Sequence, residues 1–148
     1  MLASDIRKIC VLGAGTMGSV IALRCAGRGG YEVAVFDTSK EATDRGPALL
    51  KQKGDIMVLI GTLTSNELEI ALSRIRFTTD PTEAAADADL LSESVPEKLS
   101  LKRLVHAQFD RLLPPHTIMT TNTPGLRVSD IEDVVARGEK FAALHFHG

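Results

Sequence analysis

The chain has 148 residues and a formal net charge of −2, so it has the size of a single domain that can bury a core of its own. No block of basic residues stands out, which argues against a nucleic-acid-binding protein or a protein that binds anionic membranes. The sequence shows neither a signal peptide nor an apolar stretch of membrane length, so we expect a cytoplasmic protein.

The N-terminal segment joins a short apolar run to a glycine-rich turn. Residues 8–12 are typical of a buried strand, and apolar positions at helical spacing follow the turn. In a dinucleotide-binding turn, the first glycine permits a tight turn, the second lets a pyrophosphate approach and the third lets the helix pack closely. Anions are favoured at the helix N-terminus that follows. The candidate pyrophosphate-binding loop comprises Gly13, Ala14, Gly15, Thr16, Met17 and Gly18.

A second expected strand, residues 31–37, ends in Asp37 about twenty residues after the glycines, as the dinucleotide fingerprint requires. A carboxylate at this position accepts hydrogen bonds from the adenosine ribose and repels the extra phosphate of NADP. Asp37 therefore favours NAD as the cofactor. The alternative is that Asp37 lies in the N-terminal turn of the next helix.

The segment from 38 to 73 is predicted to form a helical arm. Capping-box patterns at Thr38 and Thr64 predict that helices begin just after each of them. Gly46-Pro47 and Gly54 are poor residues for a helix interior, so we expect the first helix to be bent or broken there.

Strands and helices alternate through the rest of the chain. We expect strands at 74–78, 88–95, 117–121 and 141–146, and a helix that begins after Asp80. A long helix is predicted over 97–113, and Ser129 is expected to cap a further helix that carries Ile131, Val134 and Val135. The apolar face predicted for the long helix consists of Leu101, Leu104, Val105, Phe109 and Leu112.

This alternation predicts an α/β fold, a Rossmann-type doubly wound and mostly parallel sheet with a helical arm inserted between the second and third strands. In such sheets, ligands bind beyond the carboxyl ends of the strands. The residues expected at those ends are 13–18, Asp37, 95–97, 122–124 and His145 onward.

Together these segments resemble the N-terminal, NAD-binding domain of the L-3-hydroxyacyl-CoA dehydrogenase family. The resemblance rests on 13–18, Asp37, 61–64, 76–80, 93–97 with Lys102, 121–123 and 144–146, in the order and spacing of the family. It implies that residues 1–148 form an NAD-binding domain of an oxidoreductase of fatty acid metabolism. Such an enzyme oxidises a 3-hydroxyacyl-CoA to the 3-ketoacyl-CoA, and its full-length form is expected to be a homodimer.

The family resemblance also implies roles for individual residues. Gly13 to Gly18 would bind the pyrophosphate and Asp37 the adenosine ribose, and further cofactor contacts are implied at Val95, Pro96, Glu97, Lys102 and Asn122. The residues alone favour a different reading, in which Glu97 is an acid at a helix start and Lys102 is a solvated lysine.

His145 matches the catalytic histidine of the family. A histidine at a strand's carboxyl end can take the proton from a substrate hydroxyl while hydride passes to the nicotinamide. The residues alone favour a half-exposed histidine at the end of a strand. A metal pair with His147 is a third reading, but no further ligand stands at a recognisable spacing, so we expect no metal site.

The remaining histidines and the cysteines are expected to be structural. His106 and His116 have no partners in sequence and are predicted to lie on the surface. Cys10 and Cys25 are predicted to be buried thiols rather than a disulfide or a metal pair.

Several positions depart from the family pattern on the substrate side. Pro124 replaces a serine that helps bind substrate, and Ile60 stands where relatives often carry a lysine for the CoA phosphates. The acid that orients the histidine in relatives would lie beyond Gly148, and so would their C-terminal helical domain. We therefore expect a truncated form that is weakly active or inactive by itself. The alternatives are a non-catalytic NAD-binding module and a related NAD-dependent hydroxy-acid dehydrogenase.

Overall fold

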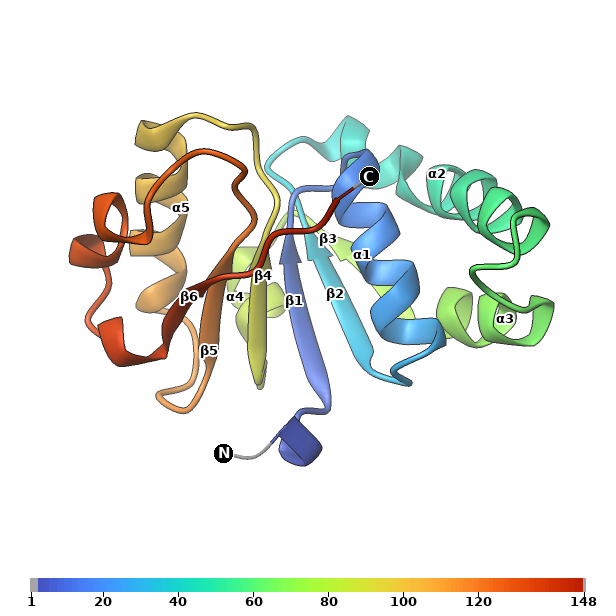
Figure 1. Ribbon diagram of the computed structural model, residues 1–148, viewed down its shortest axis with the longest axis horizontal. Helices are drawn as coiled ribbons and strands as arrows, with labels where there is room; N and C mark the ends of the chain where they lie inside the picture. The colour runs from blue at the N-terminus through green and yellow to red at the C-terminus, as the bar shows by residue number, and fades with distance from the viewer. Residues whose placement is uncertain (1–2, 148) are drawn as a thin grey trace.

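Six strands form one sheet in the computed structural model, which describes residues 3–147 (Figure 1). The strand order is β3-β2-β1-β4-β5-β6, and every neighbouring pair is parallel. The predicted α/β fold with a Rossmann-type sheet is therefore confirmed. The strands are β1 (Lys8–Leu12), β2 (Glu32–Phe36), β3 (Ile75–Thr78), β4 (Leu90–Glu93), β5 (Ile118–Thr121) and β6 (Phe141–Ala143).

Helices cover both faces of the sheet. The α-helices are α1 (Thr16–Gly27), α2 (Lys40–Leu59), α3 (Ser65–Arg74), α4 (Pro81–Ala85) and α5 (Leu99–Asp110). Short 3₁₀ turns are η1 (Ala3–Asp5), η2 (Val128–Asp130), η3 (Glu132–Val134) and η4 (Gly138–Lys140). Even α2 is too polar to cross a membrane, and no other helix in the described part of the chain is long and apolar enough to do so.

Two hydrophobic cores lie on opposite faces of the sheet, because side chains alternate along each strand. Ile9 and Val11 of β1 pack in the core that includes residues of α1, α2 and α3. Cys10 and Leu12 point the other way, into the core that contains Phe109 of α5. Burial on both faces explains the nearly continuous apolar run of β1.

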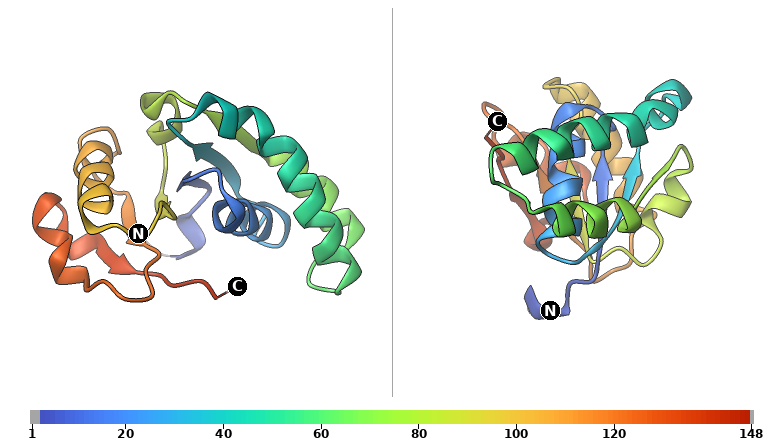
Figure 2. Two further views of the ribbon diagram at one scale, coloured as in Figure 1. Left: turned by 90° about the horizontal axis from the view of Figure 1, so that it is seen from above. Right: turned by 90° about the vertical axis from the view of Figure 1, so that its right-hand side faces the viewer.

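The predicted helical arm is present as α2 and α3, which stand beside α1 at one side of the sheet (Figure 2). The sequence predicts a bend or a break at Gly46-Pro47 and Gly54, and the break is wrong, since α2 runs without interruption from Lys40 to Leu59. Gly46 and Gly54 serve close packing instead. A Cβ on Gly46 would lie 2.4 Å from the Phe77 ring, and one on Gly54 would lie 2.2 Å from Leu68.

The N-caps predicted for the helices of this region differ in outcome. The capping box at Thr64 is confirmed, with Thr64 and Glu67 exchanging side-chain and backbone hydrogen bonds. The cap predicted at Thr38 is wrong, because Ser39 is the N-cap of α2 and accepts from the Ala42 N–H. Asp80 caps α4 as predicted.

The buried face of α5 differs from the prediction. Leu104 and Leu112 are 65% and 37% exposed, while Lys102 and His106 are fully buried beside Val105. The helix is turned so that the Lys102 ammonium meets Glu93, a contact that hydrophobic periodicity does not report.

The segment after β5 is also less regular than predicted. The helix expected after Ser129 is replaced by η2 and η3, and Ser129 caps neither. Arg103 binds this segment through the Asp130 carbonyl at 2.6 Å and the Asp133 carboxylate at 2.5 Å. Strand β6 ends at Ala143, so His145 follows the strand rather than ending it.

Candidate functional site

The carboxyl ends of the strands bring the glycine-rich loop, Asp37, the loop after β4, and Asn122 to one edge of the sheet (Figure 1). Because β1 lies in the middle of the order, its glycine-rich loop is flanked by the ends of β2 and β4. The segment after β6 then runs toward the first turn of α1, and it carries His145.

The glycine-rich loop depends on its glycines for two different reasons. Gly13 has a φ of +105°, and a Cβ there would lie 2.7 Å from the Ser94 carbonyl oxygen. A Cβ on Gly18 would lie 1.9 Å from the Gly13 carbonyl oxygen, so α1 can approach the loop only with glycine. Gly15 is the N-cap of α1 and provides no side-chain cap, which leaves the first N–H groups of the helix available to an anion.

The Asp37 carboxylate joins this loop to the start of α2. Its Oδ2 accepts from the Ala14 N–H at 2.9 Å, and its Oδ1 accepts from the Ser39 N–H at 2.9 Å. Each carboxylate oxygen retains acceptor capacity for a further donor, such as a ribose hydroxyl. Asp37 itself lies before the N-cap of α2, so the alternative that places it inside the helical turn is wrong.

A hollow of about 600 Å³ lies between the glycine-rich loop and α2. Nothing lies within 4 Å of the position that a Cβ on Gly15 would take, so the backbone there is open to a ligand. These features fit a dinucleotide, whose pyrophosphate requires free N–H groups and whose ribose requires an acceptor. The lining residues are Ala14, Gly15, Thr16, Asp37, Ala42, Arg45, Ala48, Leu49 and Gln52.

The loop after β4 extends the same edge. Val95 and Pro96 line a smaller hollow of about 120 Å³ together with Gly13 and Asp37. Glu97 is partly exposed, and its carboxylate accepts a hydrogen bond from the Thr123 hydroxyl. Of the predicted cofactor residues on this loop, Val95 and Pro96 therefore lie beside the glycine-rich loop, and Glu97 lies against Thr123.

Lys102 is fully buried beneath this loop, so the reading of it as a solvated lysine is wrong. Its Nζ donates to both oxygens of Glu93, at 2.9 and 3.0 Å, and to the Asn122 carbonyl at 3.0 Å. A direct contact between Lys102 and the cofactor stays a prediction. Burial alone would raise the pKa of Glu93, but His106, the Thr121 hydroxyl and the Lys102 ammonium together hold that pKa below its ordinary value.

Asn122 connects the end of β5 with His145. Its Oδ1 accepts from the Phe146 N–H at 3.0 Å and lies 3.0 Å from His145 Nδ1. Its Nδ2 donates to the Ser94 hydroxyl at 3.3 Å. Because a backbone N–H can only donate, the amide oxygen must face Phe146, and His145 Nδ1 must then be the protonated nitrogen. This tautomer leaves Nε2 of His145 as a proton acceptor.

The other histidines and the cysteines divide between confirmed and wrong predictions. His116 is exposed as predicted, 3.0 Å from Asp89, but the surface position predicted for His106 is wrong, since it is fully buried against Glu93 and Phe141. The cysteines form no disulfide; Cys10 is buried as predicted, whereas Cys25 is only partly buried. Burial raises the pKa of Cys10 to about 12 and that of Cys25 to about 11. The rings of His145 and His147 lie 4.4 Å apart, and among residues 3–147 no group of three or more potential metal ligands occurs.

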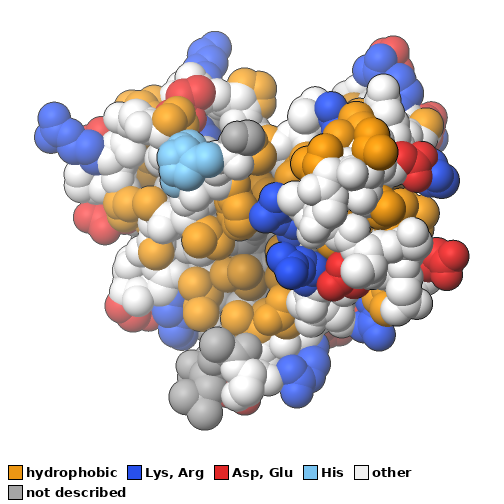
Figure 3. Space-filling model, turned by 45° about the vertical axis from the view of Figure 1, so that its right-hand side comes forward, with side chains coloured by type: hydrophobic (Ala, Val, Ile, Leu, Met, Phe, Trp, Pro, Cys, Tyr) orange, Lys and Arg blue, Asp and Glu red, His pale blue; other side chains and the backbone are white. Residues whose placement is uncertain are grey.

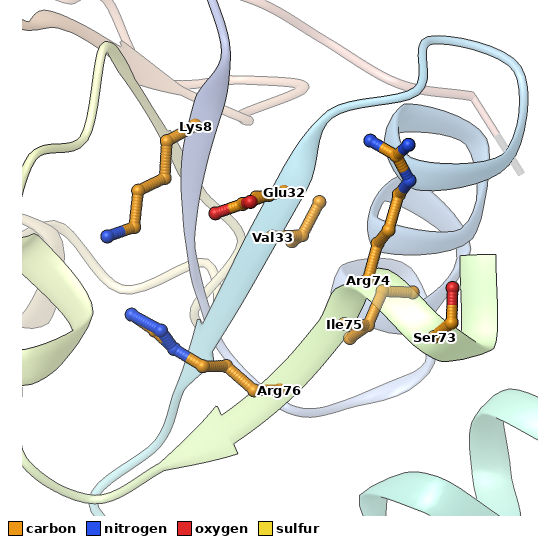
Figure 4. A pocket seen from close by; sticks show the side chains of 7 residues that line it. All are labelled: Lys8, Glu32, Val33, Ser73, Arg74, Ile75 and Arg76. Atoms are coloured by element: carbon orange, nitrogen blue, oxygen red, sulfur yellow. The ribbon is translucent and has the colours of Figure 1, made fainter. Parts of the chain in front are cut away.

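A separate pocket of about 230 Å³ lies at the amino ends of β1, β2 and β3, away from the candidate site (Figure 4). Lys8 and Arg76 extend toward the same space, and Glu32 lies between them on the intervening strand. The lining residues are Lys8, Glu32, Val33, Ser73, Arg74, Ile75 and Arg76, none of which belongs to the predicted site.

Sequence reasoning did not assign Glu93 and Thr121 a place in the site. In the structure, Glu93 pairs with the buried Lys102, and the Thr121 hydroxyl donates to Glu93. A signal for Glu93 exists in the sequence. It is a charged residue at the end of an otherwise apolar strand, where burial requires a partner. For Thr121 no comparable signal exists, because a threonine is ordinary in a strand.

The fold and this edge define a dinucleotide-binding domain of the doubly wound α/β class. Residues 8–148 match the model of the family described as the NAD-binding domain of 3-hydroxyacyl-CoA dehydrogenase. The chain therefore belongs to this family, and its cofactor is NAD.

Known proteins agree with this assignment. The chain is 34% identical to a 3-hydroxyadipyl-CoA dehydrogenase of Escherichia coli K12 and to a probable 3-hydroxybutyryl-CoA dehydrogenase of Bacillus subtilis. Each match covers 96% of this chain but only 30% and 49% of those two relatives, so the chain spans about half their length or less. Among solved structures, a diketoreductase superposes with a TM-score of 0.89 at 35% identity, covering 96% of this chain and 50% of the other.

Proposed function

We propose that this chain is the NAD-binding domain of an enzyme that oxidises a 3-hydroxyacyl-CoA to a 3-ketoacyl-CoA, with His145 as the general base. The observation that carries the proposal is the Asn122–His145 contact at the edge that also holds the glycine-rich loop and Asp37. The relatives in Escherichia coli and Bacillus subtilis are named for CoA-linked 3-hydroxy acids, which supports an acyl-CoA substrate.

His145 is suited to hold a proton at a defined atom. Asn122 accepts from Nδ1, so Nε2 presents a lone pair that no described residue uses in a hydrogen bond. The Nε2 atom would take the proton of the substrate's 3-hydroxyl group. Bound NAD would supply the acceptor for the hydride that leaves the carbon carrying this hydroxyl. The carbon–oxygen bond becomes a carbonyl, and the proton stays on His145 until solvent removes it.

The cofactor would be held by the glycine-rich loop and Asp37, with Val95, Pro96, Glu97 and Asn122 along the nicotinamide side. The hollow beside Gly15 and the remaining acceptor capacity of Asp37 support this placement. His145 is exposed, so the proposal includes a further helical domain, of the kind the family resemblance implies, that closes over it. A homodimer and a cytoplasmic location belong to the same proposal.

Calorimetric titration of the 148-residue chain with NADH and with NADPH tests the cofactor part. We expect NADH to bind more tightly, and Asp37→Ala to weaken NADH much more than NADPH. An equal loss of affinity for both cofactors would refute the ribose assignment of Asp37.

The catalytic part is tested by NAD reduction in the presence of a 3-hydroxyacyl-CoA, with the domain joined to the helical domain that closes over His145. Loss of a general base lowers the rate by about 10²–10⁴-fold, so His145→Gln should reduce the rate by at least about 100-fold and leave NADH affinity nearly unchanged. A wild-type rate no higher than that of the variant would favour a non-catalytic NAD-binding module. Pro124, which provides no hydroxyl beside Thr123, is the residue that favours this second candidate.

A further inference from the structure

The Glu93–Lys102 pair is an ion pair in the interior of the domain. Both side chains are 0% exposed, with Nζ 2.9 Å from Oε1 of Glu93. Withdrawing two charges from water costs several kcal/mol per ion, and apolar residues of similar volume often replace such pairs without loss. Stability alone is therefore a weak explanation for this pair, and its contacts suggest another.

The remaining contacts of the Lys102 ammonium fix two segments of the candidate site. Nζ donates to the Asn122 carbonyl at 3.0 Å and lies 3.3 Å from Oε2 of Glu97. One buried cation thus holds the end of β5 and the loop after β4 in a single position.

Glu93 binds the same two segments, the loop after β4 and the end of β5. Its Oε1 accepts from the Val95 N–H at 2.7 Å, and its Oε2 accepts from the Thr121 hydroxyl at 2.6 Å. Thr121 immediately precedes Asn122, so the carboxylate and the ammonium hold consecutive residues of the same strand end. Together the two charges therefore hold the chain at Thr121 and Asn122.

The backbone held in this way carries the side chain that orients His145. The Asn122 Oδ1 lies 3.0 Å from His145 Nδ1 and accepts from the Phe146 N–H at the same distance. A displacement of the Asn122 backbone would move Oδ1 away from both donors. Two hydrogen bonds, joined by the covalent bonds of Asn122, therefore connect Lys102 to His145.

We propose that Glu93 and Lys102 are positioning residues that hold Asn122 so that His145 carries its proton on Nδ1 and keeps Nε2 free. This inference rests on the proposed function, in which the free Nε2 takes the proton of the substrate hydroxyl. The tautomer itself can be measured without cofactor or substrate. A purely structural pair would stabilise the fold without setting the tautomer of an exposed histidine.

The experiment is nitrogen-15 NMR of the imidazole rings at about pH 8, where histidine side chains in water are neutral. In the wild-type chain we expect the Nδ1–H tautomer to dominate at His145. His116 is the internal control, because it lies at the opposite edge of the sheet beside Asp89 and has no contact with the pair. A wild-type His145 with its proton on Nε2 would overturn the proposal without any variant.

The decisive variant is the double substitution Glu93→Gln with Lys102→Met, which removes both charges together and leaves neither buried alone. We expect the ratio of Nδ1–H to Nε2–H forms at His145 to fall about five-fold, the effect of one lost hydrogen bond, with no change at His116. Asn122→Ala should produce the same fall by removing the acceptor directly. A folded double variant that keeps the wild-type ratio at His145 would show that the pair has only a structural role.

A milder variant covers the case in which the double substitution does not fold. Thr121→Val removes one hydrogen bond to Glu93 and retains both charges, so it should reduce the same ratio by a smaller factor than Asn122→Ala. An unchanged ratio in folded Thr121→Val, together with a fall in Asn122→Ala, would overturn the role of the pair. NADH titration of the same samples reports on the proposed function separately, since cofactor binding can fail while the tautomer result stands.

Discussion

Substituting Gly18 tests whether the glycine-rich loop packs as the structure shows. In Gly18→Ala, the new Cβ would lie 1.9 Å from the Gly13 carbonyl oxygen. Ordinary contact begins near 3.4 Å, so α1 and the loop must separate by roughly 1.5 Å. Overpacking of this kind costs about 1–3 kcal/mol. Because the atom met is backbone, which cannot rotate away, we expect about 3 kcal/mol and a fall in Tm of roughly 6–12 °C.

Gly15→Ala is the matched control in the same loop. A Cβ there meets nothing within 4 Å, so we expect the stability to change by no more than about 1 kcal/mol, the usual effect of Ala at an N-cap. The methyl group would nevertheless occupy the space where a pyrophosphate approaches, and NADH affinity should fall at least about ten-fold. Thermal melts followed by circular dichroism and calorimetric NADH titration measure both effects. A Gly18→Ala chain that melts with the wild type would refute the packing argument, and a Gly15→Ala chain that binds NADH normally would refute the phosphate assignment.

Three further predictions concern stability and reactivity. Thr64→Ala removes the capping box of α3 and should cost about 1 kcal/mol, seen as a lower Tm, whereas Thr64→Ser should retain it. The pKa of Glu93 is lower in the folded chain, so its contribution to stability is present above its unfolded pKa near 4.5 and is lost as the pH falls through the folded value. Urea unfolding at several pH values should show this loss, and Glu93→Gln should weaken the dependence. Because burial raises the thiol pKa of Cys10 and Cys25 to about 12 and 11, neither should react with a thiolate-selective reagent at neutral pH unless the chain is unfolded. Rapid labelling of the native chain would contradict this.

Local sequence signals predicted most of the fold. The apolar run of β1, the cap at Asp80 and the capping box at Thr64 depend on residues within a few positions of one another, and the structure contains all three. The errors share a different cause. Helical periodicity predicts Leu104 inside because it reports how apolar a face is, and His106 is predicted outside because it has no partner in sequence; the structure reverses both. Periodicity does not report that a lysine on that helix pairs with a strand.

The candidate site shows the same division. The glycine spacing and Asp37 are recognisable because the residues that would bind the cofactor lie within one continuous stretch of sequence. Glu93 and Thr121 were not assigned to the site, since their importance arises only from the residues that surround them after folding.

The sequence by itself determined the alternation of strands and helices, the glycine-rich turn and the acid at the end of β2, because each follows from short-range backbone preferences and spacing. Only the tertiary structure decided the strand order β3-β2-β1-β4-β5-β6. That order places Thr121 beside Glu93 across neighbouring strands, and the crossing of α5 brings Lys102 over both. Burial then requires these groups to find their partners within the protein, and the arrangement of Asn122 and His145 follows from contacts between segments more than twenty residues apart.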